Sequence, residues 1–190
     1  MSRRAAALLV AVCAVVLVAA FWLIRGPAPQ AAGEAAAPAS APLEVAPLER
    51  FPARLHRPAA GGGLAVEALD LESAAEPGAR VAAALSALLG AAPAGDFGAV
   101  FPEPVAVRRV LLGGDGTLYV DLASESGGDP PPCGSTEELQ RVYALVHTAL
   151  DAAPDATRVV LLWNGVQRRS LAGHVDTARP LGRYPALETS

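Results

Sequence analysis

The stretch that decides the fold is Gly134–Leu150, GSTEELQRVYALVHTAL, followed by Pro154–Leu171, PDATRVVLLWNGVQRRSL. Ser135 and Glu138 have the spacing of a capping box, so we expect a helix to begin there and to end before Pro154. The apolar positions of this helix, which recur at helical spacing and should face a core, are Leu139, Val142, Tyr143, Val146 and Leu150. The polar positions, which should face solvent, are Glu138, Gln140, Arg141 and Asp151.

The second part of this stretch predicts two strands. The run Thr157–Trp163, TRVVLLW, is apolar and β-branched throughout, which indicates a strand at the centre of a sheet. Asn164-Gly165 follows as a two-residue turn and predicts a return strand over Val166–Leu171. Beyond it the sequence predicts a polar tail without secondary structure.

Four further elements are expected upstream. Val105–Leu112 and Thr117–Ala123 are β-rich runs joined by the glycine-dense turn Gly113–Gly116, which predicts a hairpin rather than a phosphate-binding loop. The earlier elements that we expect are two strands, Phe51–Arg57 and Leu64–Glu72, and an amphipathic helix over Pro77–Gly90. The order ββαββαββ predicts an α+β fold: a two-layer sandwich of one mixed or antiparallel sheet with two helices on one face.

The N-terminus predicts a membrane anchor. Ala5–Ile24 is an uninterrupted apolar run of about 20 residues, which suffices to cross a bilayer as a helix. Arg3 and Arg4 precede it and only Arg25 follows at once, so residues 1–25 should form a single-pass signal anchor with the N-terminus inside. We therefore expect residence in the bacterial cytoplasmic (inner) membrane with the rest of the chain outside the cytoplasm. The alternative is a cleaved signal peptide and a secreted protein.

The remaining segments follow from composition. Residues 26–50 are dense in Pro and Ala and predict a disordered linker, residues 51–182 the folded domain, and residues 183–190 a tail. Cys13 and Cys133 are the two cysteines; they should lie in different compartments, so we expect no intramolecular disulfide. The net charge of -4 and the scattered arginines make nucleic acid an improbable partner.

Three features of the sequence form a pattern: the strand end in TLYVDLASES (residues 117–126), the helix pattern EELQRVY with its His147-Thr148 step, and the closing Gly173–Asp176, GHVD, with Pro180-Leu181. Together they resemble the GerMN domain family of bacterial sporulation and germination proteins. The resemblance covers about residues 51–182. It implies a domain similar to the ring-building motifs of secretion and sporulation machinery, used for protein association or envelope anchoring, with no catalytic residue assigned. Unlike many members, this chain has one copy of the domain and no lipid-attachment motif.

His174 and Asp176 are the first candidate site residues, because an imidazole and a carboxylate could share a metal ion or act as an acid-base pair. No second cluster has metal spacing, so we expect both to bond backbone groups. A hydrolase triad would draw on Ser124, Ser126, Ser170, His147, His174 and Asp121, but the sequence lacks the G-x-S-x-G elbow. We expect His147 to lie at a helix flank and Asp121 to be exposed or locally bonded.

Large and charged side chains give the last indications. Trp163 and Tyr143 are expected in the core, and Arg168-Arg169 on an edge strand that either resists or permits strand addition. We therefore predict a protein that is not an enzyme, with no catalytic, cofactor-binding or metal-binding residues and no cofactor. It should act as a membrane-tethered interaction or envelope-scaffold module that binds an envelope protein, itself or peptidoglycan. The alternative is a cell-wall binding module or a cell-wall hydrolase-like enzyme.

Overall fold

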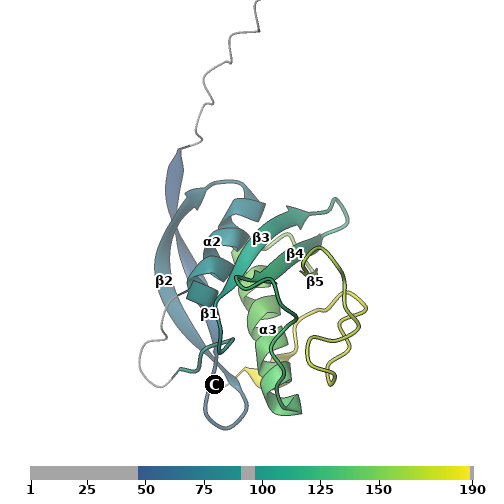
Figure 1. The fold of residues 1–190 in the computed structure, drawn as a ribbon. Helices are drawn as coiled ribbons and strands as arrows, with labels where there is room; N and C mark the ends of the chain where they lie inside the picture. The colour runs from purple at the N-terminus through teal and green to yellow at the C-terminus, as the bar shows by residue number, and fades with distance from the viewer. Residues whose placement is uncertain (1–46, 91–96, 189–190) are drawn as a thin grey trace, which may run out of the picture. The chain divides into compact units, whose positions relative to one another are not determined.

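A computed structural model of the chain describes residues 47–90 and 97–188 (Figure 1). Its elements are β1 (Leu48–Pro58), β2 (Leu64–Ala74), α2 (Pro77–Gly90), β3 (Val105–Leu112), β4 (Thr117–Ser124), α3 (Ser135–Ala152), β5 (Arg158–Trp163) and a short 3₁₀ helix η1 (Pro185–Leu187). The two helices, the β3–β4 hairpin and the first two strands lie close to where the sequence places them. The chain is a mixed α+β protein in this part, as predicted.

The first hairpin pairs β1 with β2 along their whole length. The strands are antiparallel, with Phe51 opposite Leu71 and Pro58 opposite Leu64. In β1 the buried side chains of Phe51, Ala53 and Leu55 alternate with exposed ones, so one face of the hairpin turns toward the core. The loop between the two strands allows this return, because Gly61 and Gly62 both have positive φ.

Helix α2 follows the hairpin directly and begins at Pro77, as predicted. The carboxylate of Glu76 accepts hydrogen bonds from the backbone N–H groups of Gly78 and Ala79 in the first turn of the helix. The helix buries Val81, Ala84, Leu85 and Leu88 along one stripe. Its start is therefore fixed by a local cap and its orientation by an apolar face.

The second sheet has the strand order β3-β4-β5, with β3 antiparallel and β5 parallel to β4. The central strand is β4, whose Leu118, Val120 and Leu122 are fully buried. The prediction that the run Thr157–Trp163 forms the central strand was wrong. A continuous apolar run indicates that both faces of a strand are buried, but it does not indicate the position of the strand in the sheet. Strand β5 is buried although it lies at the sheet edge, where Val166 and Leu181 form isolated bridges with it.

The predicted return strand Val166–Leu171 is absent from the structure. The Asn164-Gly165 turn does form, with φ of 53° and 77°, and closes one isolated bridge between Trp163 and Val166. The chain then leaves the sheet as an irregular loop, because its backbone groups bond to a helix side chain instead of to a strand (below). A second isolated bridge joins Leu181 to Val159 on the same edge of β5.

The two helices lie between the β1–β2 hairpin and the three-stranded sheet (Figure 1). Helix α2 contacts β1, β2 and β3, and α3 contacts β1 and β5. The prediction of one sheet with both helices on one face was therefore wrong: the strands divide into two separate sheets. Local periodicity shows that each strand has an apolar face but does not show which strands share a sheet.

Because α3 is covered on several sides, its polar side was also predicted incorrectly. Glu138, Gln140 and Arg141 are buried along with Val142 and Val146. Gln140 donates hydrogen bonds to the carbonyl oxygens of Ala59 and Gly63 in the first hairpin loop. These polar side chains connect α3 to distant loops, a role that helical spacing does not reveal.

The expected core aromatics behave differently from one another. Trp163 is fully buried, as predicted, and its Nε1 donates a hydrogen bond of 2.9 Å to the carbonyl oxygen of Gly128. Tyr143 is partly buried at the edge of the core, with its ring 5.1 Å from that of Tyr184. The C-terminal segment, for which no element was predicted, contains η1 with a buried Leu187.

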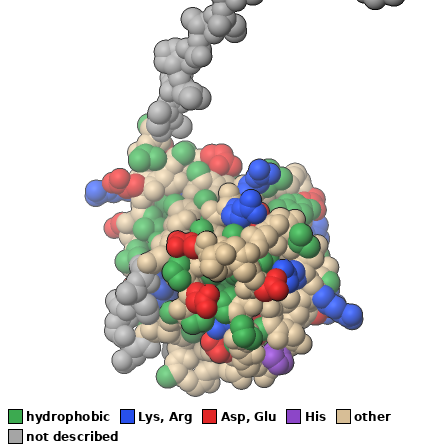
Figure 2. All heavy atoms as spheres, viewed as in Figure 1, with side chains coloured by type: hydrophobic (Ala, Val, Ile, Leu, Met, Phe, Trp, Pro, Cys, Tyr) green, Lys and Arg blue, Asp and Glu red, His purple; other side chains and the backbone are tan. Residues whose placement is uncertain are grey.

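The predicted membrane anchor over residues 1–25 and linker over residues 26–50 lie outside the described residues, apart from the last four positions of the linker. The linker prediction was wrong at this end, because residues 48–50 already belong to β1, where they pair with β2. Among the helices that the structure does describe, none has the length and hydropathy needed to cross a bilayer. Acidic and basic side chains are interspersed over the face of the described part that Figure 2 shows.

Candidate functional site

The carboxylate of Glu138 organises the loop that follows β5. Its side chain is fully buried in the first turn of α3. Oε1 accepts hydrogen bonds from the Ser170 hydroxyl (2.6 Å) and the Ala172 N–H (2.7 Å), and Oε2 accepts from the N–H groups of His174 (2.6 Å) and Val175 (3.2 Å). One side chain thus satisfies the backbone of an irregular segment that makes no sheet.

These hydrogen bonds keep Glu138 ionised. Burial by itself raises the pKa of this carboxyl, but the bonds from Ser170 and from three backbone N–H groups outweigh burial and lower its pKa to about 2. The predicted capping box is not formed, because the N-cap residue of α3 is Gly134 and no side chain caps the helix. Glu138 turns to residues 170–175 instead of to its own helix start.

His174 and Asp176 belong to the same loop but have different bonding partners. His174 Nδ1 lies 3.1 Å from Glu138 Oε2, on a side chain that is about two-fifths exposed. Asp176 accepts the N–H of Ala178 at 3.1 Å and forms a surface ion pair with Arg179. Asp176 thus bonds a backbone group, as we expected, whereas both polar groups of His174 that have a partner, its N–H and its Nδ1, bond the side chain of Glu138.

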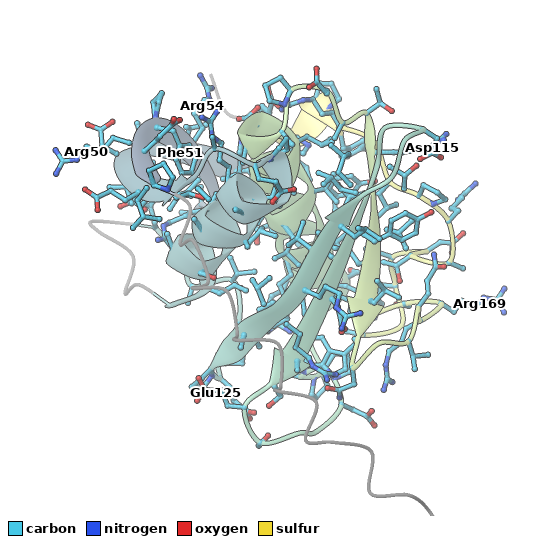
Figure 3. All side chains as sticks on the ribbon, turned by 90° about the horizontal axis from the view of Figure 1, so that it is seen from above. Arg50, Phe51, Arg54, Asp115, Glu125 and Arg169 are labelled. Atoms are coloured by element: carbon cyan, nitrogen blue, oxygen red, sulfur yellow. The ribbon has the colours of Figure 1, made fainter. Side chains whose placement is uncertain are left out.

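A shallow pocket of about 260 Å³ lies beside this loop and contains both candidates. It is lined by Arg169, Ser170, Gly173, His174, Val175 and Asp176. Figure 3 shows Arg169 pointing away from the domain into solvent. The Ser170 hydroxyl is bonded to Glu138 and accepts the N–H of Gly173. In this arrangement the carboxylate stands between the serine and the histidine, whereas in a hydrolytic relay the histidine stands between the other two.

The other residues weighed for a triad have separate local partners. Ser124 and Ser126 bond to each other, with 2.7 Å between their hydroxyl oxygens. Asp121 accepts the N–H of Gly165 at 2.7 Å and is locally bonded, as expected. His147 was predicted to lie at a helix flank, but it is fully buried. Within the described residues, no group of three or more His, Cys, Asp and Glu side chains has the geometry of a metal site.

A second polar cluster, which the sequence did not predict, surrounds His147. Its Nε2 accepts the N–H of Tyr184 at 2.9 Å and its Nδ1 lies 3.2 Å from Glu188 Oε1. The rings of His147 and His56 meet edge to face at 5.1 Å. Burial, reinforced by the neighbouring His56, lowers the pKa of His147. Because Nε2 accepts the Tyr184 N–H, the proton of the neutral ring lies on Nδ1.

Asp151 anchors the other end of this cluster. It accepts a hydrogen bond of 2.7 Å from His56 Nε2 and pairs with Arg183 and, at 3.3 Å, with Arg54. Burial raises the pKa of Asp151, but the bonds from His56 and Arg183 lower it to about 2. The cluster holds the C-terminal segment, in which Glu188 forms a bridge with Leu64 of β2. Its members come from β1, α3 and the C-terminus, so no local pattern could have found it.

Comparisons with known proteins place this domain in a family. The family described as "Germane: Sporulation and spore germination" matches residues 62–169, which is more than half of the chain. No match was found among curated proteins.

Solved structures agree with this placement at the level of the fold. A candidate lipoprotein of Clostridium perfringens has 14% identity and a TM-score of 0.51, over 75% of this chain and 93% of that one. The first GerMN domain of the Bacillus subtilis sporulation protein GerM has 20% identity and a TM-score of 0.55, over 70% of this chain and 98% of that one. The tandem GerMN domains of GerM have 19% identity and a TM-score of 0.56, over 70% of this chain but only 46% of the tandem. With a family match over most of the described domain and the same fold in GerM, this chain belongs to the GerMN-type sporulation and spore germination family.

Proposed function

We propose that this chain is a membrane-tethered, extracytoplasmic interaction or envelope-scaffold module without catalytic activity of its own. The observation that carries the proposal is the use made of Glu138. Its two oxygens are occupied by Ser170 and by backbone N–H groups, and the neighbouring His174 is bonded to the same carboxylate. The most perturbed acid in the domain thus has a role in holding a loop, which leaves little for proton transfer.

The tether rests on the sequence of the N-terminal segment. An apolar run over residues 5–24 and a Pro/Ala-rich stretch over residues 26–50 precede the domain and have the lengths of an anchor and a spacer. A candidate lipoprotein of Clostridium perfringens shares the fold, which is consistent with use of the domain at a membrane surface. The partners that we propose are an envelope protein or a second copy of the chain, with peptidoglycan as a further contact.

The test is a crosslinking pull-down with the full-length chain in membranes, combined with its mass in mild detergent. Capture of a defined envelope protein, or a stable oligomer, is the expected result. A chain that stays monomeric and captures nothing at its native abundance would argue against an interaction module. Fractionation after expression separates the anchor, which stays in the membrane, from a cleaved signal peptide, which releases the domain.

The pocket beside residues 169–176 is the observation that favours the alternative, a cell-wall ligand or hydrolase-like site. His174→Ala and Asp176→Ala distinguish the two possibilities. If the pocket is a site, these variants lose binding to isolated cell wall, or lose its cleavage, while keeping the melting temperature. If the residues serve the loop, the melting temperature falls and the variants show no separate defect toward the cell wall.

A further inference from the structure

A β-bulge in β3 places two consecutive arginines on one surface. Successive residues of a strand normally point to opposite faces, but the register with β4 shifts between Val107 and Arg109, so Arg108 is the extra residue. Both Arg108 and Arg109 are exposed. Bulges commonly redirect a side chain in this way. The result is a pair of guanidinium groups beside each other at the edge strand of the three-stranded sheet.

These arginines line a pocket of about 310 Å³ together with Asp121, Asn164 and Gly165. Arg109 lies opposite Asp121 in the register of β3 and β4, and the Asn164-Gly165 turn closes the far side. The turn is held in place because Asp121 Oδ1 accepts the N–H of Gly165. The pocket is therefore built on paired strands and a tight turn, which fix the positions of its polar groups.

The charges in the pocket do not balance. Two guanidinium groups face one carboxylate, which leaves a net positive charge. The one ion pair inside the pocket is long: Arg108 Nη1 lies 3.8 Å from Asp121 Oδ2, beyond hydrogen-bond distance. Arg108 and Arg109 thus keep donors that the described residues do not engage in a close hydrogen bond, and an added carboxylate would complement them.

Two exposed apolar side chains adjoin the pocket on the same face of the sheet. Leu111 and Tyr119 lie opposite each other in the next cross-strand pair that points outward after Arg109 and Asp121. They are 59% and 39% exposed, although the other face of the same strands is buried. An acidic side chain in the pocket would therefore lie next to a place for an apolar one.

We propose that this surface, formed by Arg108, Arg109, Leu111, Tyr119 and Asp121, binds a segment of a partner protein that carries a carboxylate side chain flanked by apolar residues. The carboxylate enters between the two guanidinium groups, and the flanking side chain covers Leu111 and Tyr119. Charge complementarity decides the occupant, because nothing in the pocket would neutralise a basic segment except the already bonded Asp121. The inference rests on the proposed interaction function and names the partner's chemistry.

A defined peptide pair tests the recognition itself. The probes are acetylated, amidated and fluorescently labelled peptides of sequence Ala-Leu-Glu-Leu-Ala and Ala-Leu-Gln-Leu-Ala, titrated against the full-length chain in detergent. We expect the Glu peptide to bind about tenfold more tightly than the Gln peptide, as charge-assisted hydrogen bonds contribute. The R108Q/R109Q variant should abolish this preference. Equal binding of the two peptides to the unaltered chain would overturn the proposal.

The matched control removes the same charge from the other sheet. R50Q/R54Q alters two exposed arginines of β1, labelled in Figure 3, and should leave the preference for the Glu peptide unchanged. If R108Q/R109Q does not fold, R108K/R109K replaces it. That variant keeps the charge but loses the planar fork of the guanidinium group, so it should reduce the preference without removing it. An unchanged preference in either pocket variant contradicts the proposal.

Site-specific crosslinking in membranes then separates this inference from the proposed function. A photoreactive residue replaces Tyr119 in one variant and Val66 of β2, which is equally exposed at 39%, in the other. A partner protein crosslinked at Tyr119 but not after R108Q/R109Q supports the proposal. Crosslinking only at Val66 keeps the interaction function but overturns this surface, as does a product at Tyr119 that is a second copy of the chain. Absence of any product at both positions contradicts both.

Discussion

The Glu138 side chain accepts the backbone N–H of His174 at 2.6 Å, although 36 residues separate the two along the chain. The bond joins a buried helix to a loop that has no regular structure of its own. It explains how residues 170–175 keep one conformation: their donors converge on one carboxylate, which stays charged because they converge on it. The loop is thus held at this point by a polar contact in addition to the packing of Leu171 and Val175 against the core.

Replacing Glu138 should strongly destabilise the domain. Glu138→Ala leaves the N–H groups of Ala172, His174 and Val175 without their acceptor, and each buried unsatisfied group costs about 1–3 kcal/mol. We expect a loss of about 3 kcal/mol or more in the free energy of unfolding, measured with urea. The control is Glu125→Ala, an exposed acid at the end of β4 (Figure 3), which should change stability by no more than about 0.5 kcal/mol. Equal stability of the two variants would show that Glu138 is dispensable.

Acid should destabilise the domain through Glu138 and Asp151. Both carboxyls have a pKa of about 2 in the folded state, against ordinary values of 4.5 and 3.8. The unfolded chain therefore binds protons first as pH falls, and the stability present above pH 4.5 is lost progressively toward pH 2. The differences correspond to about 3 kcal/mol for Glu138 and about 2 kcal/mol for Asp151. Urea unfolding across this pH range should show the decline, and Glu138→Gln should make it shallower.

His147 should make stability fall at a milder pH. Its pKa lies below the ordinary value of 6.5 because the ring is buried and faces His56. As pH falls below 6.5, the unfolded state takes up the proton and the folded state does not, so stability decreases. NMR titration of the His147 ring should give a pKa below 6.5. A value at or above 6.5 contradicts the buried, accepting role of Nε2.

The same histidine should control the C-terminal segment. Protonation of Nε2 removes the acceptor of the Tyr184 N–H. The protection of the amides of residues 184–188, taken relative to their intrinsic exchange rates, should therefore be lower at a pH below the pKa of the His147 ring than at pH 7.5. In His147→Leu the segment should exchange rapidly at both pH values. Exchange that follows the intrinsic rate in the unaltered chain would show that the segment does not depend on this bond.

Arg57 should be one of the most sensitive positions in the first hairpin. Its guanidinium is buried, pairs with Glu67, and donates to the carbonyl oxygens of Leu88 and Ala87 at the end of α2. Arg57→Ala leaves Glu67 unpaired and the last carbonyls of the helix without these donors, at a cost of about 3–5 kcal/mol. Arg50→Ala is the control: its ion pair with Glu72 is exposed, and its loss should cost less than about 1 kcal/mol in chemical denaturation.

Several parts of the fold could be predicted because their causes are local. Pro77 starts α2, the positive φ of Gly116 closes the β3–β4 turn, and Asn164-Gly165 forms the turn after β5. These signals lie within a few residues of the structures that they determine. The GerMN resemblance was likewise carried by contiguous motifs, and the family match confirmed it.

The errors have a common origin in contacts between distant segments. The spacing of Ser135 and Glu138 predicted a capping box, but the carboxylate gains more from the donors of residues 170–175 than from one N–H of its own helix. These hydrogen bonds to Glu138 also explain why the predicted strand Val166–Leu171 does not form after the Asn164-Gly165 turn. Helical periodicity placed Gln140 and Arg141 in solvent, because the spacing of residues within a helix carries no information about the distant loops that cover α3.

The sequence by itself determined the helices, the β3–β4 hairpin and the family of this domain, since these depend on spacing, turn residues and side-chain shape along short stretches. Only the tertiary structure decided that the strands form two sheets, that Glu138 holds the loop after β5, and that His147 meets His56 and Tyr184. The physical reason is that a buried polar group takes whichever partner satisfies it, and that partner can come from anywhere in the chain.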